Sequence, residues 1–116
     1  MTSALYVPSR GDVVWLDLSP VSGHEQAGRR PVLVLSPDEY NARTELMLIC
    51  PITSRRKGYA WEVVLPPALP VHGVVLADQC RSVDWTTRNP EFIATLPSGT
   101  TAAVQLRLIK LIRENV

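Results

Sequence analysis

The sequence predicts a mainly β (α+β) fold, a small curled antiparallel sheet or barrel that carries one C-terminal helix. Short apolar segments recur at regular spacing, prolines and glycines separate them, and one segment with helical periodicity ends the chain. With 116 residues, of which 46% are hydrophobic and 20% charged, the chain suits one globular domain over residues 1–116.

Strands are predicted where short β-branched or apolar runs lie between turn residues. These runs are residues 12–17, 31–36, 45–51, 60–65, 74–77, 80–85 and 91–96. The third run is almost continuously apolar, so we expect a central strand that is covered on both faces and pairs with the fourth. The sixth run is expected to continue the fifth past a bend. Three prolines between residues 66 and 73 predict a loop or an edge covering there.

Two segments are predicted as helices. Residues 37–41 suit a helical turn with Ser36 as its N-cap. The longer helix has Ser98 or Thr100 as its N-cap and is expected to end at about Arg113. Its apolar stripe is expected to be buried and consists of Val104, Leu108, Leu111 and Ile112, joined on a second side by Leu106 and Ile109. The width of this stripe leaves room for a partner subunit.

Bulk charge and targeting signals exclude several classes of protein. Lys and Arg total 12 against 11 for Asp and Glu, so the net charge of +1 gives no general electrostatic reason for a nucleic-acid partner. Any such attraction has to be local. The sequence shows no signal-peptide segment and no apolar run of the ~20 residues that span a bilayer, so a cytoplasmic protein without membrane contact is expected.

Metal and cofactor motifs are absent from the sequence. His24 and His72 lie far apart, and no cysteine or carboxylate stands at ligand spacing to either, so no metal site is expected. The chain has no phosphate-binding glycine loop and no nucleophile elbow, and no cofactor is expected. Cys50 and Cys80 lack the CxxC spacing, which predicts two buried, reduced thiols.

Two polar loops carry the side chains that suggest chemistry. Residues 23–31 hold a carboxylate, an imidazole and two guanidiniums between predicted strands, and residues 52–59 contain three consecutive cations. The candidate residues are Glu25, Arg29, Arg30 and Thr53, with Arg55, Arg56 and Lys57 close by. RNA cleavage needs a base for the 2′-hydroxyl, an acid for the leaving 5′-oxygen and donors for the charge on the phosphorane. This set could supply all three without a metal.

Each candidate also has a purely structural interpretation. Glu25 and Arg30 could form an ion pair that pins the loop, and residues 55–57 could be a solvated turn. His24 could be an ordinary surface residue, or it could transfer protons, because the usual pKa of histidine is ~6.5. The three tryptophans could stack on bases, or they could belong to the core or to a dimer interface.

The motifs, taken in order, resemble the MazF/PemK family of toxin endoribonucleases. The matching segments are residues 11–17, 23–36, 51–53, 57–59 and 76–79, and they contain E-Q-x-G-x-R-P followed by P-I-T. This resemblance runs from about residue 6 to the C-terminal helix. It implies an SH3-like barrel that forms a homodimer and cleaves single-stranded RNA at a short sequence without a metal, leaving a 2′,3′-cyclic phosphate and a 5′-hydroxyl. It also implies a cognate antitoxin whose C-terminal segment covers the RNA groove.

The same resemblance implies roles for individual residues. The family's essential arginine falls on Arg30, expected to clamp the phosphate and to act as the acid, and its essential threonine falls on Thr53, expected to stabilise the non-bridging oxygens. Glu25 is expected to act as the base or to orient Arg30. His24 stands where several relatives have a small polar residue, so an imidazole could share the acid–base work. Expected RNA contacts are Arg29, Ser54, Arg55, Arg56, Lys57, Gln79 and Arg81.

The resemblance therefore implies a sequence-specific, ribosome-independent mRNA endoribonuclease, the toxin of a type II toxin-antitoxin pair that inhibits translation and growth. Two alternatives share the fold. One is a toxin that poisons DNA gyrase by binding it, and the other is an inactive member that only binds RNA and its antitoxin. A gyrase poison would not need Arg30 and Thr53 together.

Overall fold

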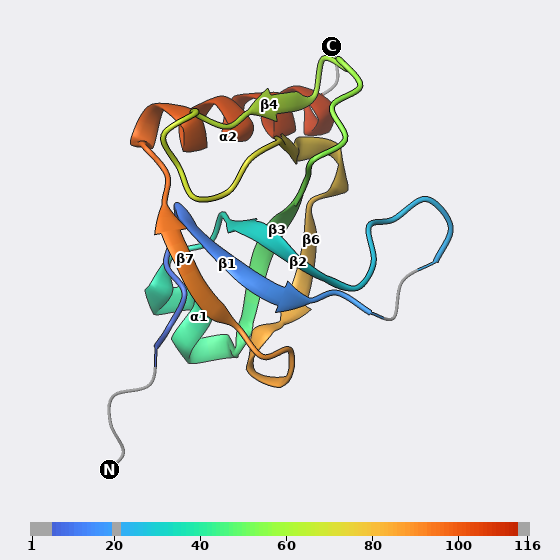
Figure 1. Ribbon diagram of the computed structural model, residues 1–116. Coiled ribbons are helices and arrows are strands. Elements are labelled where there is room, and N and C mark those ends of the chain that lie inside the picture. The colour runs from blue at the N-terminus through green and yellow to red at the C-terminus, as the bar shows by residue number, and fades with distance from the viewer. Residues whose placement is uncertain (1–5, 20–21, 114–116) are drawn as a thin grey trace.

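Alternating apolar side chains fold the chain into a curled antiparallel sheet, and the long C-terminal helix lies across one end of it (Figure 1). The computed structural model describes residues 6–19 and 22–113. The strands are β1 (Asp12–Asp17), β2 (Arg29–Val34), β3 (Leu46–Thr53), β4 (Glu62–Val64), β5 (Val74–Leu76), β6 (Arg81–Asp84) and β7 (Glu91–Thr95). The helices are α1 (Asp38–Thr44) and α2 (Ser98–Ile112), and the 3-10 turns are η1 (Ala77–Gln79) and η2 (Trp85–Thr87).

The seven strands follow the order β4-β5-β3-β2-β1-β7, and β6 pairs with the first half of β3. Every pair is antiparallel, and the ladder between β1 and β7 shifts register between Val13 and Val14. β4 and β7 are the two ends of this order, so the sheet is curled but not closed. The predicted fold class, a small curled antiparallel sheet with a C-terminal helix, is confirmed.

The expected pairing of the fourth strand with the third is wrong. β2 pairs along one edge of β3, and β6 followed by β5 pairs along the other, so β3 has no free edge left for β4. β4 pairs with β5 instead, from Glu62 opposite Leu76 to Val64 opposite Val74. The predicted continuation of the fifth strand past a bend is confirmed, because β5 and β6 follow the same edge of β3 with η1 between them.

Two apolar clusters occupy the two faces of the sheet. Side chains alternate along each strand, so Val13 belongs to the cluster that packs against α2, whereas its neighbour Val14 belongs to the other. β3 is buried without interruption from Ile49 to Thr53. In its first half, however, Leu46 and Leu48 are 39% and 40% exposed. The expectation of a strand covered on both faces is therefore wrong for the first half of β3.

The expected helix caps are not formed by the predicted side chains. α1 is longer than predicted and follows Pro37, and the Ser36 hydroxyl donates to Oδ1 of Asn41 at 2.6 Å instead of capping the helix. α2 follows Pro97, with no side-chain cap from Ser98 or Thr100. In both helices a proline precedes the first turn, and its extended backbone sets the direction in which the helix begins.

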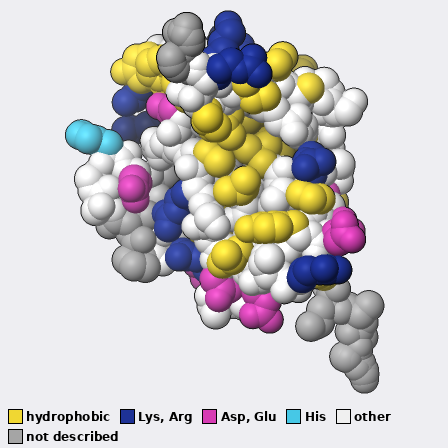
Figure 2. Space-filling model, turned by 180° about the vertical axis from the view of Figure 1, so that it is seen from behind, with side chains coloured by type: hydrophobic (Ala, Val, Ile, Leu, Met, Phe, Trp, Pro, Cys, Tyr) yellow, Lys and Arg dark blue, Asp and Glu magenta, His cyan; other side chains and the backbone are white. Residues whose placement is uncertain are grey.

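The predicted buried stripe of α2 is only partly correct. Val104 is buried and Leu108 packs against the core, but Leu111 and Ile112 are 50% and 73% exposed, because nothing in the described part of this chain covers the last turn. The residues of the second side are exposed as well. Together with Leu48 of β3, the exposed side of α2 lines an open apolar groove of about 480 Å³. Figure 2 shows hydrophobic side chains gathered on the face turned away in Figure 1.

Candidate functional site

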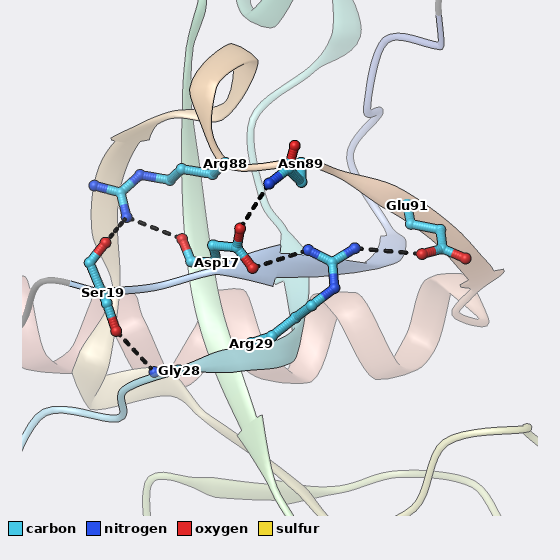
Figure 3. A network of polar contacts seen from close by, with 7 residues as sticks. All are labelled: Asp17, Ser19, Gly28, Arg29, Arg88, Asn89 and Glu91. Atoms are coloured by element: carbon cyan, nitrogen blue, oxygen red, sulfur yellow. Dashed lines mark hydrogen bonds and ion pairs between the residues drawn. The ribbon is translucent and has the colours of Figure 1, made fainter.

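The loop between β1 and β2 is fastened at its base by polar contacts (Figure 3). The backbone NH of Leu18 donates to the Gly28 carbonyl at 2.9 Å, and the NH of Gly28 donates to Oγ of Ser19 at 3.3 Å. Arg88 of the β6–β7 connection donates to the carbonyl oxygens of Asp17 and Ser19 at 3.0 and 3.2 Å. These contacts therefore fix the two ends of the charged loop relative to the sheet.

Arg29, an expected RNA contact, takes part in this fastening. Its guanidinium forms ion pairs with Asp17 at 3.0 Å and with Glu91 at 3.3 Å, both between exposed or half-buried side chains. Asn89 also donates to Asp17 at 2.8 Å, and the hydrogen bonds from Asn89 and Arg29 hold the pKa of Asp17 below its usual value. These contacts connect β2, which carries Arg29, to β1 and β7, so the structure favours a positioning role for this residue.

Arg30, the next residue of β2, takes no part in these ion pairs, although both arginines line one cavity. Its Nε donates to the carbonyl oxygen of Ala27 at 2.8 Å, which orients the guanidinium beside the loop. Arg30 lines an open cavity of about 750 Å³ together with Ser54, His72 and the 39% exposed Trp15. Within the described residues both ion pairs belong to Arg29, so the alternative of an ion pair between Glu25 and Arg30 is not realised.

Thr53 is the last residue of β3, two residues beyond the predicted end of that strand. It is buried, and its Oγ1 accepts a hydrogen bond from the backbone NH of Arg55 at 3.1 Å. That contact uses an acceptor lone pair and leaves the hydroxyl hydrogen free to donate to a ligand oxygen. The backbone of Gly73 packs against Thr53: a Cβ at Gly73 would lie 2.8 Å from the Thr53 carbonyl carbon, and φ there is +120°. The strand end that carries the hydroxyl is thus held on two sides.

The cationic loop after Thr53 is held by a buried carboxylate. Glu62 of β4 is 8% exposed and accepts hydrogen bonds from the backbone NH groups of Lys57, at 3.2 Å, and Gly58, at 2.9 Å. The side chains of Arg55, Arg56 and Lys57 stay exposed. Glu62 was not among the residues predicted from the sequence, although a single acid in an otherwise apolar strand segment was a signal for it.

The structure brings the two polar loops together around one cavity of about 460 Å³. His24 and Gln26 reach it from the first loop, and Thr53, Arg55 and Lys57 reach it from the second. A smaller cavity of about 180 Å³ lies beside it and contains Glu25, Cys80 and Arg81. Three residues line both cavities, namely Gln26, Asp78 and Gln79.

Gln79 joins the first loop to η1. Its Oε1 accepts a hydrogen bond from the backbone NH of Gln26 at 3.1 Å, so this expected RNA contact also fixes the loop in place. Asp78 lies beside it, and the sequence pattern assigned it no role. Burial, with a further contribution from the charge of Glu62, raises the pKa of Asp78. A carboxyl group of raised pKa between the two cavities is a further candidate for proton transfer.

The remaining expectations for this region have mixed outcomes. Cys50 is buried as predicted, but Cys80 is partly exposed, because η1 turns it toward the smaller cavity; both thiols are free. Trp85 belongs to the core, and its Nε1 donates to the Asn41 carbonyl at 3.0 Å.

Within residues 6–19 and 22–113 no group of three or more His, Cys, Asp or Glu could hold a metal ion, and no helix is long and apolar enough to cross a membrane.

A small curled sheet whose rim gathers an arginine, a lysine and a threonine hydroxyl around a cavity defines a class of protein equipped to bind phosphate groups. Residues 9–112 match the family model described as PemK-like, MazF-like toxin of type II toxin-antitoxin system. The chain therefore belongs to this family, as its motifs indicated.

Named relatives and solved structures agree with this assignment. The chain is 46% identical over 105 residues to the endoribonuclease toxin MazF of Escherichia coli K12, covering 90% of this chain and 89% of that protein. It is 34% identical over 93 residues to the Escherichia coli endoribonuclease PemK, covering 76% and 69%. The crystal structure of MazF from Deinococcus radiodurans superposes with a TM-score of 0.91 at 54% identity, covering 94% of this chain and 99% of that one. A MazE–MazF complex from the same organism gives a TM-score of 0.85 at 54% identity, covering 95% and 99%.

Proposed function

We propose that this endoribonuclease-family toxin cuts single-stranded mRNA at a short sequence, independently of the ribosome, and thereby inhibits translation and growth. The observation that carries the proposal is the shared cavity in which the Thr53 hydroxyl meets His24, Arg55 and Lys57. A phosphodiester there would have a hydroxyl donor at its non-bridging oxygens and the two cations of the second loop, Arg55 and Lys57, beside it. The one-domain organisation over residues 1–116 is part of the same proposal.

The reaction we propose is attack of the 2′-hydroxyl on the adjacent phosphorus. Glu25 takes the 2′-hydroxyl proton or orients Arg30, and Arg30 binds the phosphate and acts as the acid for the leaving 5′-oxygen. Thr53 donates to a non-bridging oxygen as charge builds on the phosphorane. The P–O5′ bond breaks as the P–O2′ bond forms, leaving a 2′,3′-cyclic phosphate and a 5′-hydroxyl. This set of groups needs no metal ion.

The partners of the proposed enzyme follow from its surfaces and its relatives. The exposed apolar face of α2 and β3 suits a second copy of this chain, because a monomer gains by covering such a patch. The similar MazF of Deinococcus radiodurans has been solved in complex with MazE. We extend this to a cognate antitoxin whose C-terminal segment covers the RNA groove, and we place the protein in the cytoplasm.

The test is a cleavage assay with a long RNA in the presence of EDTA. We expect cuts at a limited set of sequences, each with a cyclic-phosphate end. Arg30→Ala and Thr53→Ala should keep the fold and the oligomeric state but lose most of the cleavage. Wild-type rates in either variant would overturn the assigned roles. Intact RNA together with inhibited DNA supercoiling would instead identify a gyrase poison, and intact RNA that is still bound would identify an inactive binder.

His24 needs a separate measurement. If the imidazole carries a proton in the reaction, His24→Ala shifts the pH–rate profile as well as lowering the rate. A lower rate with an unchanged profile would assign the proton transfer to Glu25 or to another group.

A further inference from the structure

The register of the ladder between β3 and β6, extended by one residue beyond its last pair, brings the two cysteines of this chain opposite each other. The pairs run from Leu46 opposite Asp84 to Ile49 opposite Arg81. The next pair in the same register is Cys50 and Cys80, where the ladder gives way to η1. Directly opposite residues of antiparallel strands have Cα atoms about 4.5–5.5 Å apart, within the range of about 4.4–6.8 Å that a disulfide spans.

The two thiols differ in their surroundings. Cys50 is fully buried, with its sulfur 4.0 Å from the carbonyl oxygen of Ala77. Cys80 is partly exposed and lines the cavity of about 180 Å³ that also contains Glu25 and Arg81. A small oxidant can enter this space, since one water occupies about 30 Å³. The Cys80 thiol is thus partly accessible to solvent, whereas the Cys50 thiol is buried in the core.

The cavity also provides positive charge beside the accessible sulfur. Arg81 follows Cys80 in the chain and lines the same cavity, and its buried Nη1 has no hydrogen-bond partner among the described residues. The wall of this cavity therefore carries a guanidinium donor that is free to bind an anion. Contact with the Cys50 thiol lowers the pKa of Cys80, whereas contact with Cys80 and burial raise the pKa of Cys50. Cys80 is therefore the thiol suited to attack, and Cys50 the one suited to follow.

We propose that Cys80 and Cys50 form a peroxide-sensitive thiol pair that closes to a disulfide beside the candidate active site. The Cys80 thiolate attacks one oxygen of a hydroperoxide, the O–O bond breaks, and the other oxygen leaves as hydroxide or alkoxide, which takes up a proton. Cys50 then attacks the Cys80 sulfur, the S–O bond breaks, and the departing hydroxide accepts the Cys50 proton. Two thiols lose two electrons, and the peroxide is reduced.

Closure of this disulfide would alter the segment that holds the first polar loop. Cys80 follows Gln79, which accepts the hydrogen bond from Gln26, and Cys50 lies three residues before Thr53. Drawing the Cys80 sulfur from contact into a covalent bond with Cys50 would pull on the backbone that carries Gln79 and Arg81. This consequence rests on the proposed RNA cleavage. The oxidised protein should cleave RNA about tenfold more slowly or worse, because displacing a catalytic group by about an ångström can cost up to 10²-fold.

The first experiment concerns the thiols alone. The reduced full-length protein is treated with hydrogen peroxide, and its thiols are counted and its intact mass is measured. We expect both thiols to disappear, a mass lower by two hydrogen atoms, and a tryptic peptide that joins the two cysteines until a dithiol reductant is added. Two remaining thiols, or a disulfide between two chains on a non-reducing gel, would overturn the proposal.

Two variants assign the steps. Cys50→Val keeps an apolar side chain in the core and should trap Cys80 as a sulfenic acid, seen as one added oxygen atom and as reaction with dimedone. Cys80→Ser should leave Cys50 unmodified at the same peroxide concentration. Oxidation of Cys50 in Cys80→Ser as fast as in the unmodified protein would contradict the assigned order.

Cleavage is then compared between the reduced, oxidised and re-reduced protein. A reversible fall in rate that is absent in Cys50→Val supports control of the site by the disulfide. An unchanged rate despite complete disulfide formation would overturn that control. If the reduced protein cleaves no RNA, the proposed function fails, whereas the thiol counts and masses still decide whether the pair forms.

Discussion

Gly73→Ala tests whether the glycine after the proline-rich loop is what positions Thr53. The added Cβ would meet the Thr53 carbonyl group and would lie 3.0 Å from the Cα of Ser54. Carbon atoms in contact normally stay about 3.5–4.0 Å apart, so the two backbones have to separate by roughly an ångström. The β3–β5 ladder consists of the pairs at Ile52 and Thr53, so this separation would break the ladder at the candidate site.

The cost of this substitution has two parts. An L-residue held at φ +120°, as found at Gly73, is strained by about 1–3 kcal/mol. Forcing the neighbouring backbone apart adds about 1–3 kcal/mol, as overpacking does in cores. The free energy of unfolding should therefore fall by about 2–6 kcal/mol, a large share of the ~5–15 kcal/mol of a typical domain. Urea denaturation followed by tryptophan fluorescence measures this loss.

Two control variants separate strain from collision. Gly58 has φ +83°, and a Cβ added there would meet nothing within 4 Å, so Gly58→Ala should cost only about 1–2 kcal/mol. Gly99, in the first turn of α2, has neither a positive φ nor a neighbour, and Gly99→Ala should gain up to about 1 kcal/mol. If Gly73→Ala loses no more than Gly58→Ala, the close approach does not hold Thr53 and the reasoning is refuted.

Three further substitutions test the polar framework. Glu62→Gln weakens the contacts to the cationic loop and should cost about 1–2 kcal/mol in urea denaturation; an unchanged midpoint would mean that the loop does not depend on this carboxylate. Arg29→Ala removes only half-exposed ion pairs, so it should cost less than about 1 kcal/mol while lowering the cleavage rate, and wild-type cleavage would exclude a positioning role. The folded-state pKa of Asp17 is lowered, so its contribution to stability is present above the unfolded pKa of about 3.9 and is lost as the pH falls through the folded value. Asp17→Asn should therefore reduce the dependence of the thermal midpoint on pH below about 4, and an unaltered acid slope would contradict this.

Local sequence patterns predicted most of the elements. The first strand was expected over residues 12–17 and is found there, because β-branched alternation between turn residues depends on neighbours in the chain. The pairing of β4 with β5 was missed, because it depends on which strands occupy the two edges of β3. The exposure of Leu111 and Ile112 was missed for a related reason: a helical stripe shows that a side is apolar but not what covers it.

The candidate site was predicted as two loops, and the structure does place them around one cavity. The supporting residues were harder to find. Gly73 acts on Thr53 from twenty positions away, and nothing in the sequence around either residue indicates that their backbones touch. Arg29 was expected to contact RNA, and only the ladder with β1 showed that it lies opposite Asp17 and pairs with it. Contacts between distant segments decided these roles.

The two halves of the site are attached to the fold in different ways. Thr53 belongs to the sheet itself, whereas Glu25 and His24 lie on a loop that is fastened at its base and through the hydrogen bond between Gln26 and Gln79. The distance between the halves therefore depends on the contacts at the base of the loop and on this one hydrogen bond, and not on the sheet alone. A molecule that binds only to the outside of the loop could separate the groups that must act together. Inhibition of such a site does not require an inhibitor that competes for the phosphate position.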